Sequence, residues 1–328
     1  MGQTREAFHV SYSDAEEALE EINKKTGRNM VQATATGIML IVVIVGSLVW
    51  RTDLFMALIV VVTALAVWEL RVDFAAVNFR IPFFALSIST SLTFLAGYYC
   101  EQHAAAMVIG TLCSAVWVVI ASSFQFEEKA RVSKAVQIKP TCDSPTIKAK
   151  ESGADRLLAD RVAHVGVSLM VVGYITVLSC FIILPLTWGH PAAHAFMSIF
   201  IPAAGDLGGL FFGAMFGKHK LSSRISPKKS YEGLLGSAFF CAVAALCIGF
   251  FTYSHEFFAQ KWPLLILMGT AVSVTGTFGD LCASMLKRDI GIKDMGHLLK
   301  GHGGIVDRVD SILISAPFVC AIIAVTGM

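Results

Sequence analysis

Nine long apolar runs, separated by short charged segments, constrain the fold of this chain more than any other feature. A helix of about 20 mostly apolar residues crosses the hydrocarbon layer of a membrane and satisfies its own backbone hydrogen bonds there. With 55% hydrophobic and 15% charged residues among 328, the chain has too little polar sequence for a soluble domain of this length. The sequence therefore predicts an all-α polytopic integral membrane protein with about nine transmembrane helices, over residues 33–50, 54–70, 82–99, 104–122, 164–186, 192–216, 232–253, 262–283 and 307–327.

The positions of lysine and arginine predict how these helices are oriented. Cytoplasmic loops of membrane proteins carry an excess of these two residues. With nine spans and a cytoplasmic N-terminus, 24 of the 26 Lys and Arg residues fall in cytoplasmic segments, and only Arg51 and Lys261 fall outside. A wrong number of spans would break this alternation, so the pattern supports both the nine spans and an external C-terminus. The net charge of +2 is too small to indicate a nucleic-acid partner.

The polar segments divide the chain into a cytoplasmic N-terminal segment (1–32), a four-helix membrane part (33–122), a cytoplasmic insert (123–163) and a five-helix catalytic membrane part (164–328). The first segment has no apolar core of a signal peptide, which favours a bacterial inner membrane over an organellar one. The spacing of its apolar residues predicts a short amphipathic helix over 11–25. The insert is expected to form a loop over 124–162, with limited helix near 152–162.

Aspartates at the ends of the eighth and ninth runs indicate a metal site. Ionisable residues at membrane depth are costly and usually mark function. Asp280 ends one run, and Asp307 and Asp310 open the next, three residues apart and therefore on one helix face. Carboxylate oxygens gathered at the cytoplasmic boundary, with phosphate oxygens to complete the shell, suit Mg²⁺.

Basic residues around these aspartates indicate that the site binds a polyphosphate. The positive charge comes from Lys287, Arg288, Lys293 and Arg308. An arginine can bind phosphate through two parallel hydrogen bonds. Glycines on both sides of His302 let backbone N–H groups approach a phosphate closely, although a structural role for this histidine is equally compatible with the sequence. The excess of positive charge in cytoplasmic loops would explain the basic residues alone, but not the three aspartates.

A second basic segment, residues 216–233, follows the sixth run. It carries five cations in about a dozen residues, including Lys228 and Lys229, together with Ser226. A helix is expected to begin at its end, and phosphate can bind at a helix N-terminus. A generic basic patch beside a membrane would look similar.

These motifs resemble the signature of the phosphatidate cytidylyltransferases, also called CDP-diacylglycerol synthases. The resemblance rests on Ser284-Met-Leu-Lys-Arg, then Lys293-Asp, then His302-Gly-Gly-Ile-Val-Asp-Arg-Val-Asp, with matching spacing throughout. The basic segment ends Ile225-Ser-Pro-Lys-Lys-Ser-Tyr-Glu-Gly, which is similar to that family's second motif, and Trp68-Glu also fits. The resemblance covers about residues 200–311, and the earlier runs only by architecture.

The sequence departs from the family pattern after Asp206. The family's Asp-x-x-Ala-Tyr-x-x-Gly-Arg reads Asp-Leu-Gly-Gly-Leu-Phe-Phe-Gly-Ala over residues 206–214, so the Tyr and the Arg are absent. This difference leaves room for an altered lipid substrate. The glycines follow small-xxx-small spacing, which is typical of helix packing.

The resemblance implies that the phosphate of phosphatidic acid attacks the α-phosphorus of CTP, giving CDP-diacylglycerol and pyrophosphate. Mg²⁺ would be bound by Asp280 and Asp307, and the sequence leaves open whether a second cation binds. The expected catalytic residues are Asp280, Asp307, Asp310 and Lys229. The expected substrate-binding residues are Ser226, Lys228, Ser284, Lys287, Arg288, Lys293, His302 and Arg308. Family analogy also implies a homodimer.

Two other functions are compatible with parts of this pattern. A CTP-dependent polyprenol or phytol kinase would also bind CTP at a membrane face, but it would transfer the γ-phosphoryl group and release CDP. An ion-coupled transporter could use Asp206 and Asp280 along an ion path. Transporters, however, usually place their charges near the midplane between two related halves, and this chain has no internal repeat.

Overall fold

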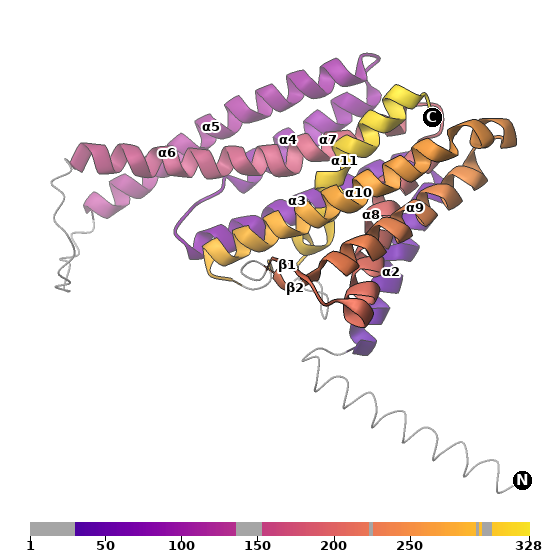
Figure 1. Cartoon of the computed structure of the whole chain (residues 1–328). Helices are drawn as coiled ribbons and strands as arrows, with labels where there is room; N and C mark the ends of the chain where they lie inside the picture. Colours follow the sequence, from indigo (N-terminus) through magenta and orange to yellow (C-terminus); the bar gives the residue numbers. More distant parts are fainter. Residues whose placement is uncertain (1–29, 136–152, 223–225, 293–294, 297–303) are drawn as a thin grey trace, which may run out of the picture.

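The computed structural model describes residues 30–135, 153–222, 226–292, 295–296 and 304–328, and helices make up most of this part (Figure 1). The helices are α2 (Met30–Trp50), α3 (Thr52–Ala76), α4 (Phe83–Tyr99), α5 (His103–Ala135), α6 (Gly153–Val171), α7 (Leu178–Ile183), α8 (Pro191–Phe216), α9 (Tyr231–Thr252), α10 (His255–Ile290) and α11 (Val306–Thr326). A π-helical turn η1 (Val172–Val177) joins α6 to α7, and a 3₁₀ turn η2 (Leu184–Thr187) follows α7. Two short strands, β1 (Lys220–Ser222) and β2 (Ser226–Ser230), form an antiparallel hairpin before α9.

The described helices confirm the predicted class of polytopic α-helical membrane protein. Seven of them, counting α6 to η2 as one, are long and apolar enough to cross a membrane, and Thr36–Trp50 and Phe83–Tyr99 are shorter apolar helices. Large apolar side chains face outward along many of these helices, such as Val49, Leu92 and Phe251. Such exposure is expected where the surrounding solvent is lipid.

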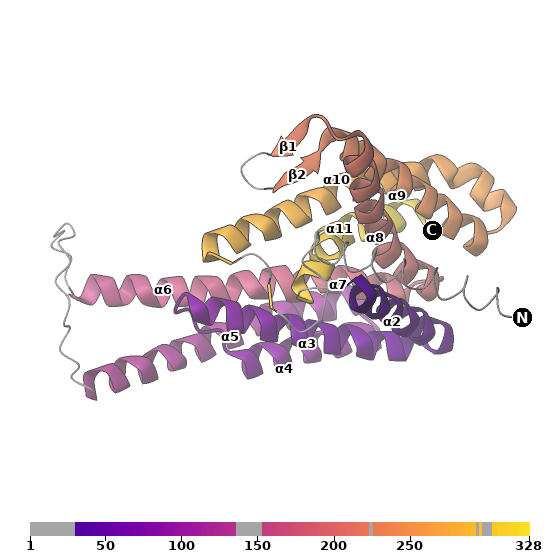
Figure 2. The ribbon, with the colours of Figure 1, turned by 90° about the horizontal axis from the view of Figure 1, so that it is seen from below.

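The helices form two layers with α11 between them. Figure 2 shows α3 to α6 in one layer and α8, α9, α10 and the hairpin in the other. Each layer has its own buried cluster of apolar side chains. From α11, Leu313 and Ala316 belong to the first cluster, and Val319 and Ile323 belong to the second. The helix that carries Asp307 and Asp310 is therefore held by both layers.

Helices α8 and α9 pack closely because glycines face each other at their crossing. A Cβ atom added to Gly208 would lie 2.7 Å from the carbonyl oxygen of Gly236 and 2.7 Å from Cβ of Phe240. At Gly209 the nearest atom would be the carbonyl oxygen of Gly233, at 3.6 Å. The predicted helix-packing role of these glycines is confirmed at Gly208.

Three expectations differ from the structure or lie outside it. The insert was expected to be a loop over 124–162 with limited helix near 152–162. The start of α6 at Gly153 agrees with that helix, but α5 continues to Ala135, because polar residues such as glutamate and lysine extend a helix readily beyond its apolar part. The basic segment forms a β-hairpin, an exception to the all-α prediction. The amphipathic helix predicted over 11–25 lies outside the described residues.

Helix α10 is also longer than its apolar run. Its 36 residues correspond to about 54 Å at 1.5 Å per residue, compared with a hydrocarbon layer of about 30 Å. Asp280 was expected at the end of this span, but the helix continues to Ile290. As a result Asp280, Ser284 and Lys287 lie on one face of a continuous helix.

The crossing of α8 and α9 should be intolerant of even one methyl group. We expect Gly208→Ala to lower the free energy of unfolding by about 1–3 kcal/mol, because the added Cβ overlaps α9. Gly166→Ala is the matched control, since its Cβ would meet nothing within 4 Å and alanine stabilises a helix by about 1 kcal/mol relative to glycine. Thermal unfolding of both variants in detergent measures the difference, and equal midpoints would contradict the packing argument.

Candidate functional site

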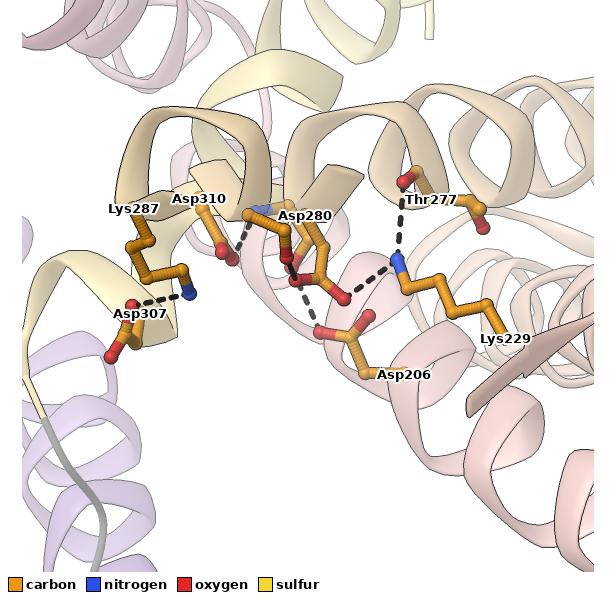
Figure 3. Close-up of polar contacts among 9 residues, drawn as sticks. Asp206, Lys229, Thr277, Asp280, Lys287, Asp307 and Asp310 are labelled. Atoms are coloured by element: carbon orange, nitrogen blue, oxygen red, sulfur yellow. Dashed lines mark hydrogen bonds and ion pairs between the residues drawn. The ribbon is translucent and has the colours of Figure 1, made fainter. Parts of the chain in front are cut away.

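One cavity of about 650 Å³ gathers most of the charged residues singled out in the sequence. Among the described residues, four carboxylates line it, from Asp206, Asp280, Asp307 and Asp310, and three cations, from Lys229, Lys287 and Arg308. They come from α8, α10 and α11 and from the hairpin, as Figure 3 shows for six of them. The remaining wall is formed largely by small residues of α8 and α9: Gly205, Gly209, Gly213, Ala214, Gly233 and Ser237.

The hairpin delivers Lys229 to Asp280. The Lys229 ammonium lies 2.6 Å from Oδ2 of Asp280 and donates to the carbonyl oxygen of Thr277 at 3.2 Å (Figure 3). Ser230, which follows Lys229 at the end of β2, caps α9, since its Oγ accepts from the N–H of Gly233 at 3.1 Å. Glu232 in the first turn of α9 accepts from the ring of His219 at 2.7 Å, which ties the start of the hairpin to the same helix. The hairpin is thus fixed against α9 and holds its lysine over the cavity.

A second ion pair joins α10 to α11 in a more buried position. The Lys287 ammonium donates to Oδ1 of Asp307 at 2.8 Å, and the backbone N–H of Met295 donates to Oδ2 at 3.0 Å. Both carboxylate oxygens of Asp307 are therefore bonded within the protein. The side chains of Lys287 and Asp307 are only 11% and 9% exposed.

Ser311 connects the two remaining carboxylates. Its hydroxyl donates to Oδ2 of Asp206 at 2.8 Å, and its backbone N–H donates to Oδ1 of Asp310 at 2.7 Å. Asp310 is 4% exposed. The serine joins α11 to α8 and so fixes the distance between acidic groups from two helices.

The donor set suits a hard divalent cation that is partly bound by substrate. Within the described ranges, no three His, Cys, Asp or Glu side chains are arranged to bind a metal by themselves. Mg²⁺ usually takes one or two protein carboxylates and completes its shell with water and phosphate oxygens. The oxygen-rich wall of this cavity fits such a shared site, in which the protein supplies only part of the coordination.

The structure brings together most, but not all, of the predicted site residues. Asp280, Asp307, Asp310, Lys229, Ser226, Lys287 and Arg308 all line the cavity. Ser284 lies beside it and donates to Oδ1 of Asp280 at 3.4 Å, whereas Arg288 is exposed in the last turn of α10 and is not part of the cavity wall. Lys293 and His302 lie outside the described residues, as does the side chain of Lys228. Roles for these three residues stay predictions.

The structure brings further residues to the site, of which only Asp206 begins a motif recognised in the sequence. Asp206, Thr277 and Ser311 line or bond the cavity groups but were not among the predicted site residues. The hydroxyl of Tyr174, on η1, is buried and has no hydrogen-bond partner among the residues the structure describes. A π-helical turn inside a helix is frequent at functional sites, but nothing in the apolar sequence around Tyr174 predicts one.

The two departures from the family pattern meet at this cavity. Leu210 and Ala214, which stand where Tyr and Arg are usual, both line it. Its α8 wall is therefore apolar where a phenol and a guanidinium would otherwise stand.

The two lysine–aspartate pairs should differ in their contribution to stability. Removing one partner of a buried pair costs about 3–5 kcal/mol, because the other charge remains buried alone, so we expect a loss of that size for Lys287→Met. The Lys229 and Asp280 side chains are 22% and 37% exposed, and pairs accessible to solvent contribute about 0–1 kcal/mol. Unfolding of Lys287→Met and Lys229→Met in detergent tests which variant loses more stability. An equal or larger loss for Lys229→Met would contradict the prediction.

Comparisons with known proteins indicate the family to which the chain belongs. Residues 31–326 match the cytidylyltransferase family. The chain is 44% identical over 126 residues to the phosphatidate cytidylyltransferase of Mycobacterium leprae, a match that covers 38% of each protein. It is 47% identical over 114 residues to that of Mycobacterium tuberculosis H37Rv, covering 34% of this chain and 33% of the relative. It is 38% identical over 128 residues to the phosphatidate cytidylyltransferase of Staphylococcus haemolyticus, covering 39% of this chain and 46% of the relative.

The matched segments thus span less than half of the length of these relatives, whereas the family match spans nearly the whole chain. On that match, the chain belongs to the cytidylyltransferase family.

Proposed function

We propose that this protein transfers the cytidylyl group of CTP to phosphatidic acid, giving CDP-diacylglycerol and pyrophosphate for phospholipid synthesis. One observation carries the proposal: a single cavity gathers four carboxylates beside three cations in a chain built of membrane-spanning helices. Family membership and the names of the relatives favour this reaction over a lipid kinase or a transporter.

The proposed reaction requires neutralisation of charge more than acid–base catalysis. An oxygen of the phosphatidate phosphate forms a bond to the α-phosphorus of CTP, while the bond from that phosphorus to the bridging oxygen of the β-phosphate breaks. Pyrophosphate leaves with the electron pair of the broken bond. Because a phosphate monoester is already ionised at neutral pH, no strong general base is needed. Lys229, Lys287 and Arg308 on the cavity wall would bind the phosphate oxygens.

Asp280 and Asp307 are our proposed ligands of Mg²⁺, which would neutralise part of the charge of the triphosphate. Asp206 and Asp310 supply further carboxylates on the same wall. In the structure each proposed ligand is bonded to a lysine, Asp280 to Lys229 and Asp307 to Lys287. When substrate binds, each lysine would exchange its carboxylate for a phosphate oxygen, so that no buried charge loses a partner.

Asp280→Asn should abolish turnover while leaving the fold intact. We expect a loss of at least about 100-fold in kcat, because the amide carries no charge and binds Mg²⁺ poorly. The matched control is Asp53→Asn, since Asp53 lies in the first turn of α3, 40% exposed and paired with Arg51. Near-full activity of Asp280→Asn in a detergent assay would refute its role.

The released product distinguishes the proposed function from its rivals. With purified protein, Mg²⁺, CTP and phosphatidic acid, we expect pyrophosphate and CDP-diacylglycerol to form together. Release of CDP would instead indicate a kinase. No lipid-dependent consumption of CTP would indicate that the protein is not a cytidylyltransferase of phosphatidic acid.

We also propose nine spans in a bacterial inner membrane, with the N-terminus and the cavity on the cytoplasmic side and the C-terminus outside. The bacterial relatives and the distribution of Lys and Arg support this orientation. A C-terminal alkaline phosphatase fusion should then be active, and a C-terminal green fluorescent protein should be dark. The opposite result would refute the orientation or the number of spans. The family resemblance further implies a homodimer.

A further inference from the structure

Glu69 is a buried carboxylate in the layer opposite the hairpin, and it bonds the helix that carries Asp307. It lies on α3 and is 2% exposed. Its Oε2 accepts from the backbone N–H of Val306 at 3.0 Å. The two partners are 237 residues apart in sequence.

This bond caps the N-terminus of α11. The first N–H groups of a helix have no partner inside the helix and are usually capped by a nearby side chain. Ile305, the N-cap residue of α11, makes no side-chain cap hydrogen bond. A carboxylate at this end is also attracted by the positive end of the helix dipole. Glu69 therefore caps α11 from another helix, whereas most helices are capped by a serine or aspartate at their own N-cap position.

Glycines let the chain approach this carboxylate closely. A Cβ atom added to Gly304 would lie 2.8 Å from Oε2 of Glu69 and would overlap the carbonyl of Met295. One added to Gly296, whose φ is +65°, would lie 2.6 Å from Cδ and Oε1 of Glu69. Only residues without a side chain fit at these two positions, so the glycines and the glutamate form one packed unit.

The same unit is hydrogen-bonded to a residue of the cavity wall. Met295, next to Gly296, donates its N–H to Asp307, which is bonded to Lys287. Asp307 lies one position after Val306, whose N–H Glu69 binds. A shift of the start of α11 would therefore move Asp307 and Arg308 relative to Lys287 and Asp280.

We propose that Glu69 is a positioning residue: by capping α11 from α3, its carboxylate fixes Asp307 and Arg308 at the cavity wall. It is not among the described residues that line the cavity. The effect on enzymatic activity that we expect from this inference rests on the proposed function, but the effect on amide hydrogen exchange does not.

Glu69→Gln is the principal test, since it keeps the shape of the side chain and removes the charge. We expect amide hydrogen exchange in a peptide covering 304–312 to become about tenfold faster, because a charge-assisted cap is replaced by a weaker neutral one. We also expect kcat to fall about tenfold or more and the Mg²⁺ concentration for half-maximal activity to rise, because Asp307 is less well positioned. Glu69→Asp, which keeps the charge on a shorter side chain, should recover part of both effects.

Glu256→Gln is the matched control, because Glu256 is an exposed glutamate in the first turn of α10, at the end remote from Asp280. It should leave exchange and activity unchanged. If Glu69→Gln does not fold in detergent, the comparison is made with Glu69→Asp alone, for which faster exchange over 304–312 and a higher Mg²⁺ requirement are expected.

Wild-type exchange over 304–312 in the variant that folds would overturn the capping role. Faster exchange with unchanged kcat and Mg²⁺ dependence would overturn the positioning role. If the wild-type protein forms no CDP-diacylglycerol, the proposed function fails, while the exchange measurement still decides whether Glu69 caps α11.

Discussion

The structure depends on the pairing of charges in a cavity between membrane-spanning helices. An isolated buried charge is costly, so each carboxylate needs a partner whose position is fixed. Asp280 has Lys229, Asp307 has Lys287, and Asp206 has the hydroxyl of Ser311. These partners come from different elements, so the same bonds that stabilise the charges also determine how α8, α10, α11 and the hairpin are arranged around them.

Helix α11 transmits this arrangement to the rest of the fold. Its first turns carry Asp307 and Asp310, and its later turns pack into the apolar clusters of both layers. Its start is held by Glu69 from α3 and by the ion pair to Lys287 on α10. The N-terminal helices are therefore not only a membrane anchor, because one of them supplies the cap on which the start of α11 depends.

The sequence predicted the helices and the convergence of the aspartates well, and the partners of those aspartates poorly. Apolar runs identify membrane helices because length and composition are enough to recognise them. Asp280 and Asp307 stand at neighbouring ends of two successive apolar runs, and this placement indicated a shared site. Periodicity identifies residues on one face of a helix, but it does not say which helices touch. The bonds from Ser311 to Asp206 and from Val306 to Glu69 join residues 105 and 237 positions apart, so they follow only from the packing. The end of α5 was missed for a different reason, because a helix need not stop where its apolar run does.

The balance of charge in the cavity bears on the proposed chemistry. Among the residues that the structure describes, its wall holds four carboxylates and three cations, so with all of them ionised these groups carry one net negative charge. Neither a triphosphate nor a phosphatidate would enter such a cavity favourably alone, because both are anions. A divalent cation reverses the sign, and the lysines that now neutralise Asp280 and Asp307 then become available to phosphate oxygens. Ala214 stands where the family pattern has an arginine, and a fourth cation there would have balanced the four carboxylates of the described wall without metal. The arrangement of charges therefore supports a metal-bound nucleotide as the species that the cavity accepts.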